Sequence, residues 1–159
     1  MSLRVVVMGV SGCGKSTLGR VLASALGARF VDADDLHPAE NIAKMAAGQP
    51  LDDADRVPWL DRCAAALAAG PVVLACSALK RRYRDRLRVA APDLRLIHLA
   101  APQTLLAGRL VARTGHFMPA GLLASQFAAL EVPDGEGALV LDAMAPLEAQ
   151  LATALRALV

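Results

Sequence analysis

The stretch VVVMGVSGCGKST, residues 5–17, decides the fold. An apolar, β-branched run ends at Met8, and the glycine-rich segment after it matches the pattern G-x-x-x-x-G-K-[ST] at residues 9–16. Apolar residues then recur at helical spacing from Leu18 to Leu26. A strand, a tight loop and a helix in this order predict a loop that wraps phosphate groups at a helix N-terminus.

The residue types in this loop fit a nucleoside triphosphate, and we expect ATP. Glycines let the backbone approach phosphate without a Cβ clash, and successive amides in residues 12–17 form an anion-binding nest. Lys15 is expected to reach the β- and γ-phosphates and to act in catalysis, while the Ser16 hydroxyl is expected to bind Mg²⁺. The expected nucleotide-binding residues of the loop are Gly9, Ser11, Gly12, Cys13, Gly14, Lys15, Ser16 and Thr17.

Short apolar runs and helix-like segments alternate along the rest of the chain. This alternation predicts an α/β fold of three layers, in which helices cover both faces of a five-stranded parallel sheet. We expect one domain over residues 1–159, with ligands beyond the carboxyl ends of the strands. Further strands are predicted near residues 30–31, 71–76, 94–99 and 138–141, and helices near 38–47, 53–68, 79–90, 102–113, 119–130 and 146–158.

Composition argues against several classes of protein. The chain has 159 residues, a net charge of +2 and 3 cysteines. No apolar run reaches the roughly 18 residues of a membrane span, and no signal-peptide pattern is present. The low net charge argues against a nucleic-acid partner, and the three scattered cysteines suggest neither a disulfide framework nor a zinc site. We therefore expect a cytoplasmic protein with no membrane and no nucleic-acid partner.

The second strand ends in a cluster of acids, VDADDLHPAEN at residues 31–41. In an extended stretch alternate side chains share a direction, so Asp32 and Asp34 would face the cleft and Asp35 would turn away. Asp32, nearest the loop, is expected to hold Mg²⁺, and Asp34 to orient and deprotonate an acceptor hydroxyl. The alternative is a solvated acidic turn. His37 either caps the next helix or reaches substrate hydroxyls.

Missing motifs narrow the class of nucleotide-binding protein. The N-K-x-D motif by which GTPases read their base does not occur in the chain. The third strand ends ACSALK, without the carboxylate that ATPase motors usually carry at this point. Acids after the second strand could supply the metal and base functions instead, which favours a small-molecule kinase.

The segment GQPLDDADRVPWL, residues 48–60, reads as a turn that enters a helix. Asp52 and Asp55 have the spacing of a capping box, with Asp in place of the usual Glu. Arg56 follows at once and is the candidate for a cation that faces the substrate.

Two further groups of cations follow the third and fourth strands. In CSALKRRYRDRLR, Lys80 and Arg84 share one helical face just beyond a strand end, where they could bind a substrate carboxylate; the alternative is a solvated basic face. Arg109 and Arg113 precede a glycine loop, which suits a lid over residues 113–130 that closes on ATP. Arg109 would bind ATP and Arg113 would stabilise the transferred phosphoryl group; an exposed helix C-terminus is the alternative.

Four segments together resemble the small P-loop gluconokinases: VMGVSGCGKST, DADDLHPAENIAKMAAGQPLDDADRVPWL, CSALKRRYRDRLR and RTGHFM with the later LLASQFAALEVP. The resemblance covers roughly residues 5–133, and its middle segments differ from shikimate kinases. It implies a fold like that of nucleoside-monophosphate kinases with a helical lid, and Mg²⁺- and ATP-dependent phosphorylation of D-gluconate at its 6-hydroxyl. It also implies a homodimer, with His116 and Gln126 as substrate contacts from the lid.

Two points stay open after the resemblance. The segment DGEGALVLDA after Pro133 departs from the family pattern, which leaves the adenine contacts near residues 142–146 undefined. The cation that binds the acceptor carboxylate is one of Lys80, Arg84 and Arg56. The alternative functions are a kinase for another small hydroxylated acid, such as shikimate, and a nucleotide-binding module without an acceptor.

Overall fold

The computed structural model describes residues 3–106 and 120–159. Five strands form one sheet in the order β2-β3-β1-β4-β5, and all four neighbouring pairs are parallel. This confirms the predicted five-stranded parallel sheet, with each strand near its predicted position. The strands are β1 (Arg4–Met8), β2 (Arg29–Asp32), β3 (Val72–Ala75), β4 (Arg95–Ala100) and β5 (Leu139–Asp142).

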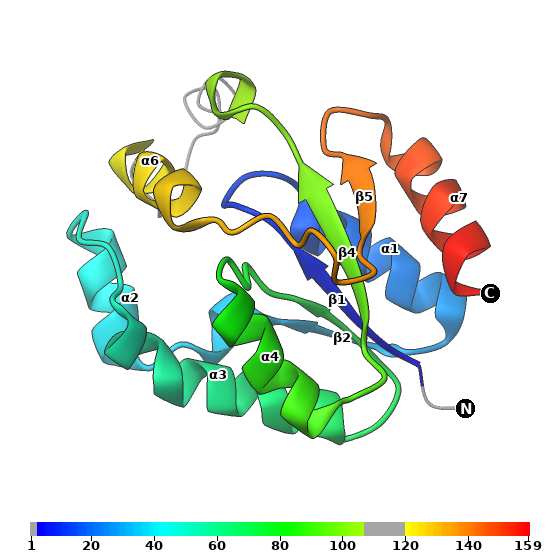
Figure 1. The fold of residues 1–159 in the computed structure, drawn as a ribbon, viewed down its shortest axis with the longest axis horizontal. Helices are drawn as coiled ribbons and strands as arrows, with labels where there is room; N and C mark the ends of the chain where they lie inside the picture. Colours follow the sequence, from blue (N-terminus) through cyan, green and yellow to red (C-terminus); the bar gives the residue numbers. More distant parts are fainter. Residues whose placement is uncertain (1–2, 107–119) are drawn as a thin grey trace.

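Helices cover both faces of the sheet, as Figure 1 shows. Successive residues of β1 point to opposite faces: Val5 and Val7 pack in the cluster that includes α1 and α7, whereas Val6 and Met8 pack in the cluster that includes α3 and α4. The predicted three-layer α/β fold is therefore confirmed. The helices are α1 (Lys15–Leu26), the 3₁₀ turn η1 (Ala33–Leu36), α2 (Ala39–Ala46), α3 (Asp53–Ala68), α4 (Arg81–Ala90), α6 (Ala120–Ala129) and α7 (Leu147–Leu158).

The carboxyl ends of the parallel strands meet at one edge of the sheet. The segments that leave β1, β2 and β3 at this edge are residues 9–14, 33–38 and 76–80. The chain from α2 to the start of α3, together with α6, lies beyond the edge (Figure 1). Ligands of open α/β sheets bind at such an edge.

The described helices also settle two smaller points. The capping box is confirmed, since the Asp52 carboxylate accepts from the Asp55 amide at 2.7 Å and the Asp55 carboxylate accepts from the Asp52 amide at 2.9 Å. Within the described ranges, no helix combines the length and hydropathy that a membrane crossing requires.

Candidate active site

The loop between β1 and α1 has the conformation that its glycines permit. A Cβ on Gly9 would lie 2.7 Å from the backbone oxygen of Leu99, too close for any other residue. Gly14 has a φ of 99° and stands directly before α1, so the first amides of that helix open toward the loop. The Lys15 ammonium donates to the carbonyl of Val10 at 3.0 Å. The predicted strand, loop and helix are all present.

Ser16 and Asp32 meet across the gap between α1 and β2. The Ser16 hydroxyl donates to Asp32 Oδ2 at 2.6 Å, and Asp32 Oδ1 accepts from the Asp34 amide at 3.0 Å. Both side chains offer oxygen, which Mg²⁺ prefers, and Mg²⁺ usually takes only one or two carboxylates beside phosphate and water. Within the described residues no group of three or more His, Cys, Asp or Glu side chains surrounds a common point. The pair therefore fits a Mg²⁺ ion that is shared with phosphate.

Asp34 and Asp35, which follow β2, lie in a 3₁₀ turn. The prediction of an extended conformation for this segment is therefore wrong. The Asp32 carboxylate caps the turn η1 by accepting from the Asp34 amide, which bends the chain where alternation was assumed. Asp34 nevertheless lines a pocket together with Lys15 of the phosphate loop, and Asp35 does not line it. Asp34 thus faces the pocket as predicted, but a turn and not an extended strand places it there.

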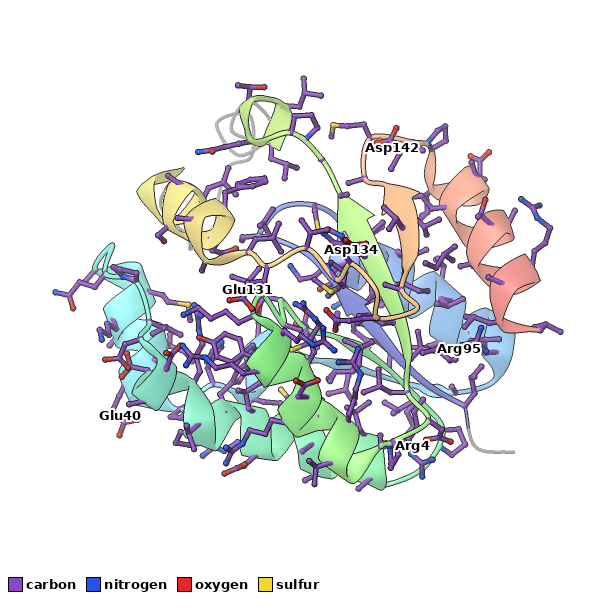
Figure 2. All side chains as sticks on the ribbon, in the orientation of Figure 1. Arg4, Glu40, Arg95, Glu131, Asp134 and Asp142 are labelled. Carbon is purple, nitrogen blue, oxygen red and sulfur yellow. The ribbon has the colours of Figure 1, made fainter. Side chains whose placement is uncertain are left out.

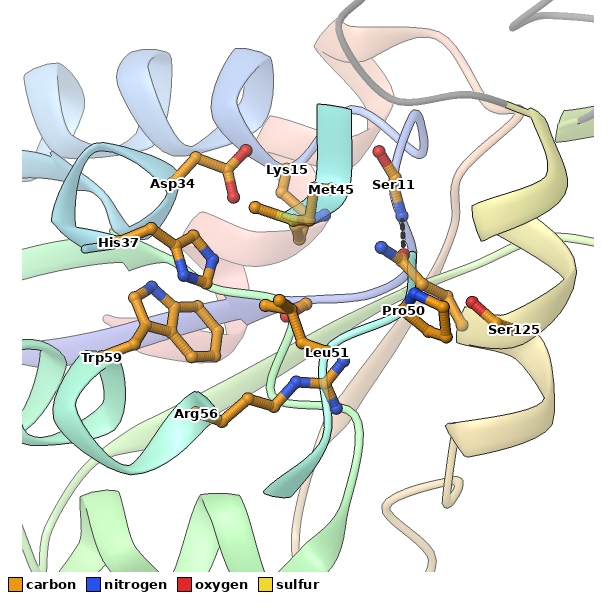
Figure 3. Close-up of a pocket in the computed structure, with 12 residues that line it drawn as sticks. Ser11, Lys15, Asp34, His37, Met45, Pro50, Leu51, Arg56, Trp59 and Ser125 are labelled. Carbon is orange, nitrogen blue, oxygen red and sulfur yellow. Dashed lines mark hydrogen bonds between the residues drawn. The ribbon is translucent and has the colours of Figure 1, made fainter. Parts of the chain in front are cut away.

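The pocket opens at the carboxyl edge of the sheet, between the phosphate loop, η1, the start of α3 and α6 (Figure 3). Figure 3 shows Asp34, His37 and Trp59 on one side, Arg56 below, and Ser11 and Ser125 opposite. Its lining residues are Ser11, Lys15, Asp34, His37, Met45, Pro50, Leu51, Arg56, Trp59, Ser77, Ser125 and Gln126. Charged and polar groups line this pocket together with the apolar side chains of Met45, Pro50, Leu51 and Trp59, which suits a small polar molecule.

His37 is buried against Trp59 at the wall of this pocket. The two rings stack with centroids 4.4 Å apart and planes 8° apart, and the His37 Nδ1 lies 3.2 Å from Asn41 Nδ2. Burial lowers the pKa of His37 to about 4, and the nearby Arg56 charge acts in the same direction. His37 is therefore neutral at physiological pH. Trp59 and Asn41 were not among the predicted site residues, although Trp59 is the chain's single tryptophan.

Two of the three candidate cations occupy different surroundings. Arg56 lines the pocket and donates from Nη1 to the Tyr83 hydroxyl at 3.0 Å. Lys80 lies at the N-cap of α4, where its ammonium is 3.2 Å from Asp53 Oδ1, and it is absent from the pocket lining. Hydrogen bonding from Tyr83, then from Lys80, lowers the pKa of Asp53. Of Arg56 and Lys80, Arg56 is thus the cation that lines the pocket.

The expectation that Arg84 binds a substrate carboxylate is wrong. Its side chain is 1% exposed and forms an ion pair with the 2% exposed side chain of Glu136, with contacts of 2.9 and 2.7 Å. Arg84 also donates from Nη1 to the carbonyl of Ala78 at 2.8 Å and from Nη2 to the carbonyl of Glu131 at 2.9 Å. Glu131 itself lies beside the start of α4 (Figure 2). Arg84 is therefore buried and makes four hydrogen bonds within the protein, through which it holds the α6–β5 connection against α4.

The proposed lid residues divide between described and undescribed parts of the chain. Gln126 of α6 lines the pocket, and its Oε1 accepts from the Ser11 amide of the phosphate loop at 2.6 Å. The expectations for Arg109, Arg113 and His116 lie outside the described residues. On the described side, α6 contacts the phosphate loop directly.

A second pocket lies on the other side of the phosphate loop. It is lined by Cys13, Gly14, Thr17, Ala143, Ala145, Leu147 and Gln150. Gln150 is 7% exposed, and its Nε2 donates to the carbonyls of Asp142 and Ala145 at 3.0 and 3.2 Å. Both partners only accept, so the amide orientation is fixed, and Oε1 has no hydrogen-bond partner in the described structure. A site next to the loop with one fixed acceptor suits the base of a nucleotide.

Comparisons with known proteins agree with this geometry. A family described as "AAA domain" matches residues 5–133. A gluconokinase of Gluconobacter oxydans is 52% identical over 134 residues, which cover 81% of this chain and 75% of that protein. The thermosensitive gluconokinase of Escherichia coli is 46% identical, and the match covers 82% of this chain and 73% of that protein.

Solved structures show the same relationship. A gluconokinase from Sinorhizobium meliloti superposes with a TM-score of 0.91 at 48% identity, over 99% of this chain and 91% of that chain. Shikimate kinase from Aquifex aeolicus superposes with a TM-score of 0.68 at 15% identity, over 98% of this chain and 96% of that chain. The second likeness shows a shared fold only.

Proposed function

Because the chain belongs to the gluconokinase family, and is accordingly a kinase, we propose that it transfers the γ-phosphoryl group of ATP to the 6-hydroxyl of D-gluconate. The observation that carries this proposal is one pocket in which Lys15 of the phosphate loop, Asp34 and Arg56 line a common space. Phosphate, an acceptor hydroxyl and an acceptor carboxylate each find a matching group there. NMR of the isolated product, which distinguishes 6-phosphogluconate from its isomers, tests the position of transfer.

ATP would lie along the phosphate loop, with its triphosphate on the amides of the loop and of α1. Lys15 would leave the Val10 carbonyl to bind the β- and γ-phosphates. Ser16 and Asp32 would hold Mg²⁺, Ser16 directly and Asp32 through the water shell of the ion. When bound, Mg²⁺ would neutralise charge on the phosphates.

The adenine would occupy the pocket between Gly14 and Gln150. Gln150 Oε1 would accept from the exocyclic amino group of adenine, whereas guanine presents a carbonyl oxygen at that position. This pocket includes Ala143, the last residue of the segment that departs from the family pattern, so a base contact near residues 142–146 is part of the proposal.

Replacing Gln150 with Met is expected to raise the KM for ATP by roughly 3–10-fold, because one hydrogen bond to the base is lost. The KM for GTP should change less, so the ratio of the KM for GTP to the KM for ATP should decrease. Steady-state kinetics with both nucleotides measure this, and the KM for gluconate is the internal control. An unchanged ATP-to-GTP preference would remove Gln150 from base recognition.

The acceptor would bind with its carboxylate at Arg56 and its far hydroxyl between Asp34 and the γ-phosphate. Asp34 takes the proton of that hydroxyl while the new O–P bond forms and the bond from the γ-phosphorus to the β–γ bridging oxygen breaks. ADP is the leaving group. Lys15, and Arg113 from the lid, stabilise the charge that develops on the transferred group. His37, His116 and Gln126 are proposed to contact the acceptor around this axis.

The different surroundings of Arg56 and Lys80 favour Arg56 as the ligand of the acceptor carboxylate. Because Arg56 lines the pocket and Lys80 is held by Asp53, Arg56→Met is expected to raise the KM for gluconate by about 10-fold or more, the scale of a hydrogen bond to a charged group. Lys80→Met, the matched control, should raise it by less. Initial-rate kinetics at saturating MgATP measure both. A larger increase in the gluconate KM for Lys80→Met than for Arg56→Met would instead indicate Lys80 as the ligand of the carboxylate.

Two expectations concern the protein as a whole. We propose a homodimer, which the family resemblance supports, and a cytoplasmic location, which the composition of the chain supports. Light scattering in solution tests the first, since a dimer has twice the chain mass of 16.6 kDa. A mass equal to one chain at micromolar concentration would contradict it.

A further inference from the structure

A buried amide fixes the protonation pattern of His37. Asn41 is 4% exposed, and its Nδ2 donates to the backbone carbonyl of Asp55 at 2.9 Å. A carbonyl oxygen only accepts, so the Asn41 atom at this place must be the amide nitrogen. The same nitrogen lies 3.2 Å from His37 Nδ1 and cannot accept a hydrogen bond. His37 Nδ1 must therefore be the acceptor, and it carries no proton.

The other neighbours of His37 fix the orientation of its imidazole ring and keep the ring neutral. Trp59 stacks on its face, and the Trp59 indole is itself held by a hydrogen bond from Nε1 to the Ala33 carbonyl at 2.7 Å. The lowered pKa of His37, about 4, disfavours the doubly protonated ring above pH 5. With Nδ1 unprotonated, a neutral ring has its proton on Nε2.

The remaining ring nitrogen is available to the pocket. His37 Nε2 has no hydrogen-bond partner among the described residues. It is also not among the polar atoms of these residues that are both buried from solvent and unpaired, so it remains accessible. His37 lines the pocket beside Asp34 and Arg56 (Figure 3). The proton on Nε2 is therefore offered where the acceptor would bind.

We propose that Asn41 is a positioning residue that holds His37 as the Nε2–H tautomer, so that the ring donates a hydrogen bond to a hydroxyl oxygen of the sugar acid. This rests on the proposed function. A hydroxyl that accepts from Nε2–H must direct its own hydrogen elsewhere, and Asp34 lies on the same side of the pocket. The opposite tautomer would instead accept the hydroxyl hydrogen and compete with Asp34.

The tautomer can be read without any substrate. In long-range ¹H–¹⁵N NMR spectra of the free protein at pH 7, His37 should show a protonated Nε2 and an unprotonated Nδ1. The chain has 3 histidines, and a His37→Gln sample identifies the signal. A protonated Nδ1 in the wild-type protein would overturn the proposal.

Asn41→Asp reverses the interaction, because a carboxylate accepts from Nδ1–H and raises the pKa of His37. Above the raised pKa, the neutral ring carries its proton on Nδ1, and the KM for gluconate should be roughly 3–10-fold above wild type. As the pH falls through that pKa, Nε2 regains its proton and the ratio of variant to wild-type KM should fall. A merely structural role for Asn41 would raise KM without this pH dependence.

The controls address the other charges in the neighbourhood. Asp34, Lys15 and Arg56 line the same pocket, and Lys44 pairs with Asp55 beside Asn41, so wild type and variant are compared at each pH. Asn41→Leu removes the amide without adding a carboxylate, and it should raise KM without a new titration. In the double variant His37→Gln with Asn41→Asp, the amide nitrogen replaces Nε2 and cannot titrate, so the pH dependence should vanish.

Two outcomes would contradict the kinetic part. If Asn41→Asp protonates Nδ1 but leaves the gluconate KM at the wild-type value, His37 does not donate to the acceptor. If the pH dependence persists in the double variant, it arises from another group. Absence of gluconate-dependent turnover in the wild type would instead contradict the proposed function, and the NMR result would be unaffected by it.

Discussion

Replacing Asp34 with Asn is expected to lower kcat by about 10²–10⁴-fold, because an amide cannot take the proton of the acceptor hydroxyl. Affinity for MgATP should change little, since the Ser16–Asp32 pair and the glycines of the loop remain intact. Asp34 lines the pocket with Lys15, so its loss is expected to act at the step of phosphoryl transfer. Steady-state kinetics give kcat, and titration with a nonhydrolysable ATP analogue gives the nucleotide affinity.

The neighbouring acid supplies the matched control for this variant. Asp35 belongs to the same 3₁₀ turn and carries the same charge, but it does not line the pocket. Asp35→Asn should therefore keep kcat within about 3-fold of wild type. An Asp34→Asn enzyme with near-normal kcat would show that Asp34 is not the base, and equal losses in both variants would point to a general effect of charge.

Replacing Arg84 with Met is expected to lower the free energy of unfolding by about 3–5 kcal/mol, because the buried Glu136 carboxylate loses its buried partner and keeps, among the described residues, only the contact with the partly exposed Arg88. Chemical denaturation measures this loss. The gluconate KM of the folded fraction should stay close to wild type, since Arg84 is buried and its guanidinium makes four hydrogen bonds within the protein. An Arg84→Met protein with wild-type stability and a raised gluconate KM would contradict this prediction and indicate that Arg84 binds the substrate.

Arg88 and pH provide the controls for the ion pair. Arg88 also contacts Glu136, at 2.8 Å, but its side chain is 25% exposed, so Arg88→Met should cost only about 1 kcal/mol. The hydrogen bond from Arg84 lowers the pKa of Glu136 from 4.5 to about 2. Because the pKa of Glu136 is lower in the folded than in the unfolded state, its ionisation stabilises the fold fully above pH 4.5, and this stabilisation is lost as the pH falls toward 2. The difference between wild type and Arg84→Met should shrink over that interval.

Local signals in the sequence were sufficient for the sheet, the phosphate loop and the capping box. Each depends on residues within a few positions of one another, such as the glycines before Lys15 or the pair Asp52 and Asp55. Asp34 was also placed in the pocket, although by the wrong local geometry. The Asp32 carboxylate caps its own turn, and periodicity assumed for an extended chain does not include such a bond.

Long-range pairing explains what the sequence did not indicate. The spacing of Lys80 and Arg84 predicts a shared helical face, but it does not indicate that Glu136, 52 positions further along, covers part of that face. The stack of His37 on Trp59 depends in the same way on two elements that are separate in sequence. Burial of a cation or an imidazole follows from tertiary contacts, which no short motif records.

The most direct test of the central claim is ADP release from MgATP in the presence of a panel of acceptors. The panel contains D-gluconate, shikimate, other sugar acids and nucleoside monophosphates, each at the same concentration. Gluconate is expected to stimulate ADP release most strongly, with 6-phosphogluconate formed in equal amount. Release that gluconate does not stimulate, or that shikimate or a nucleoside monophosphate stimulates more, would contradict the proposed function.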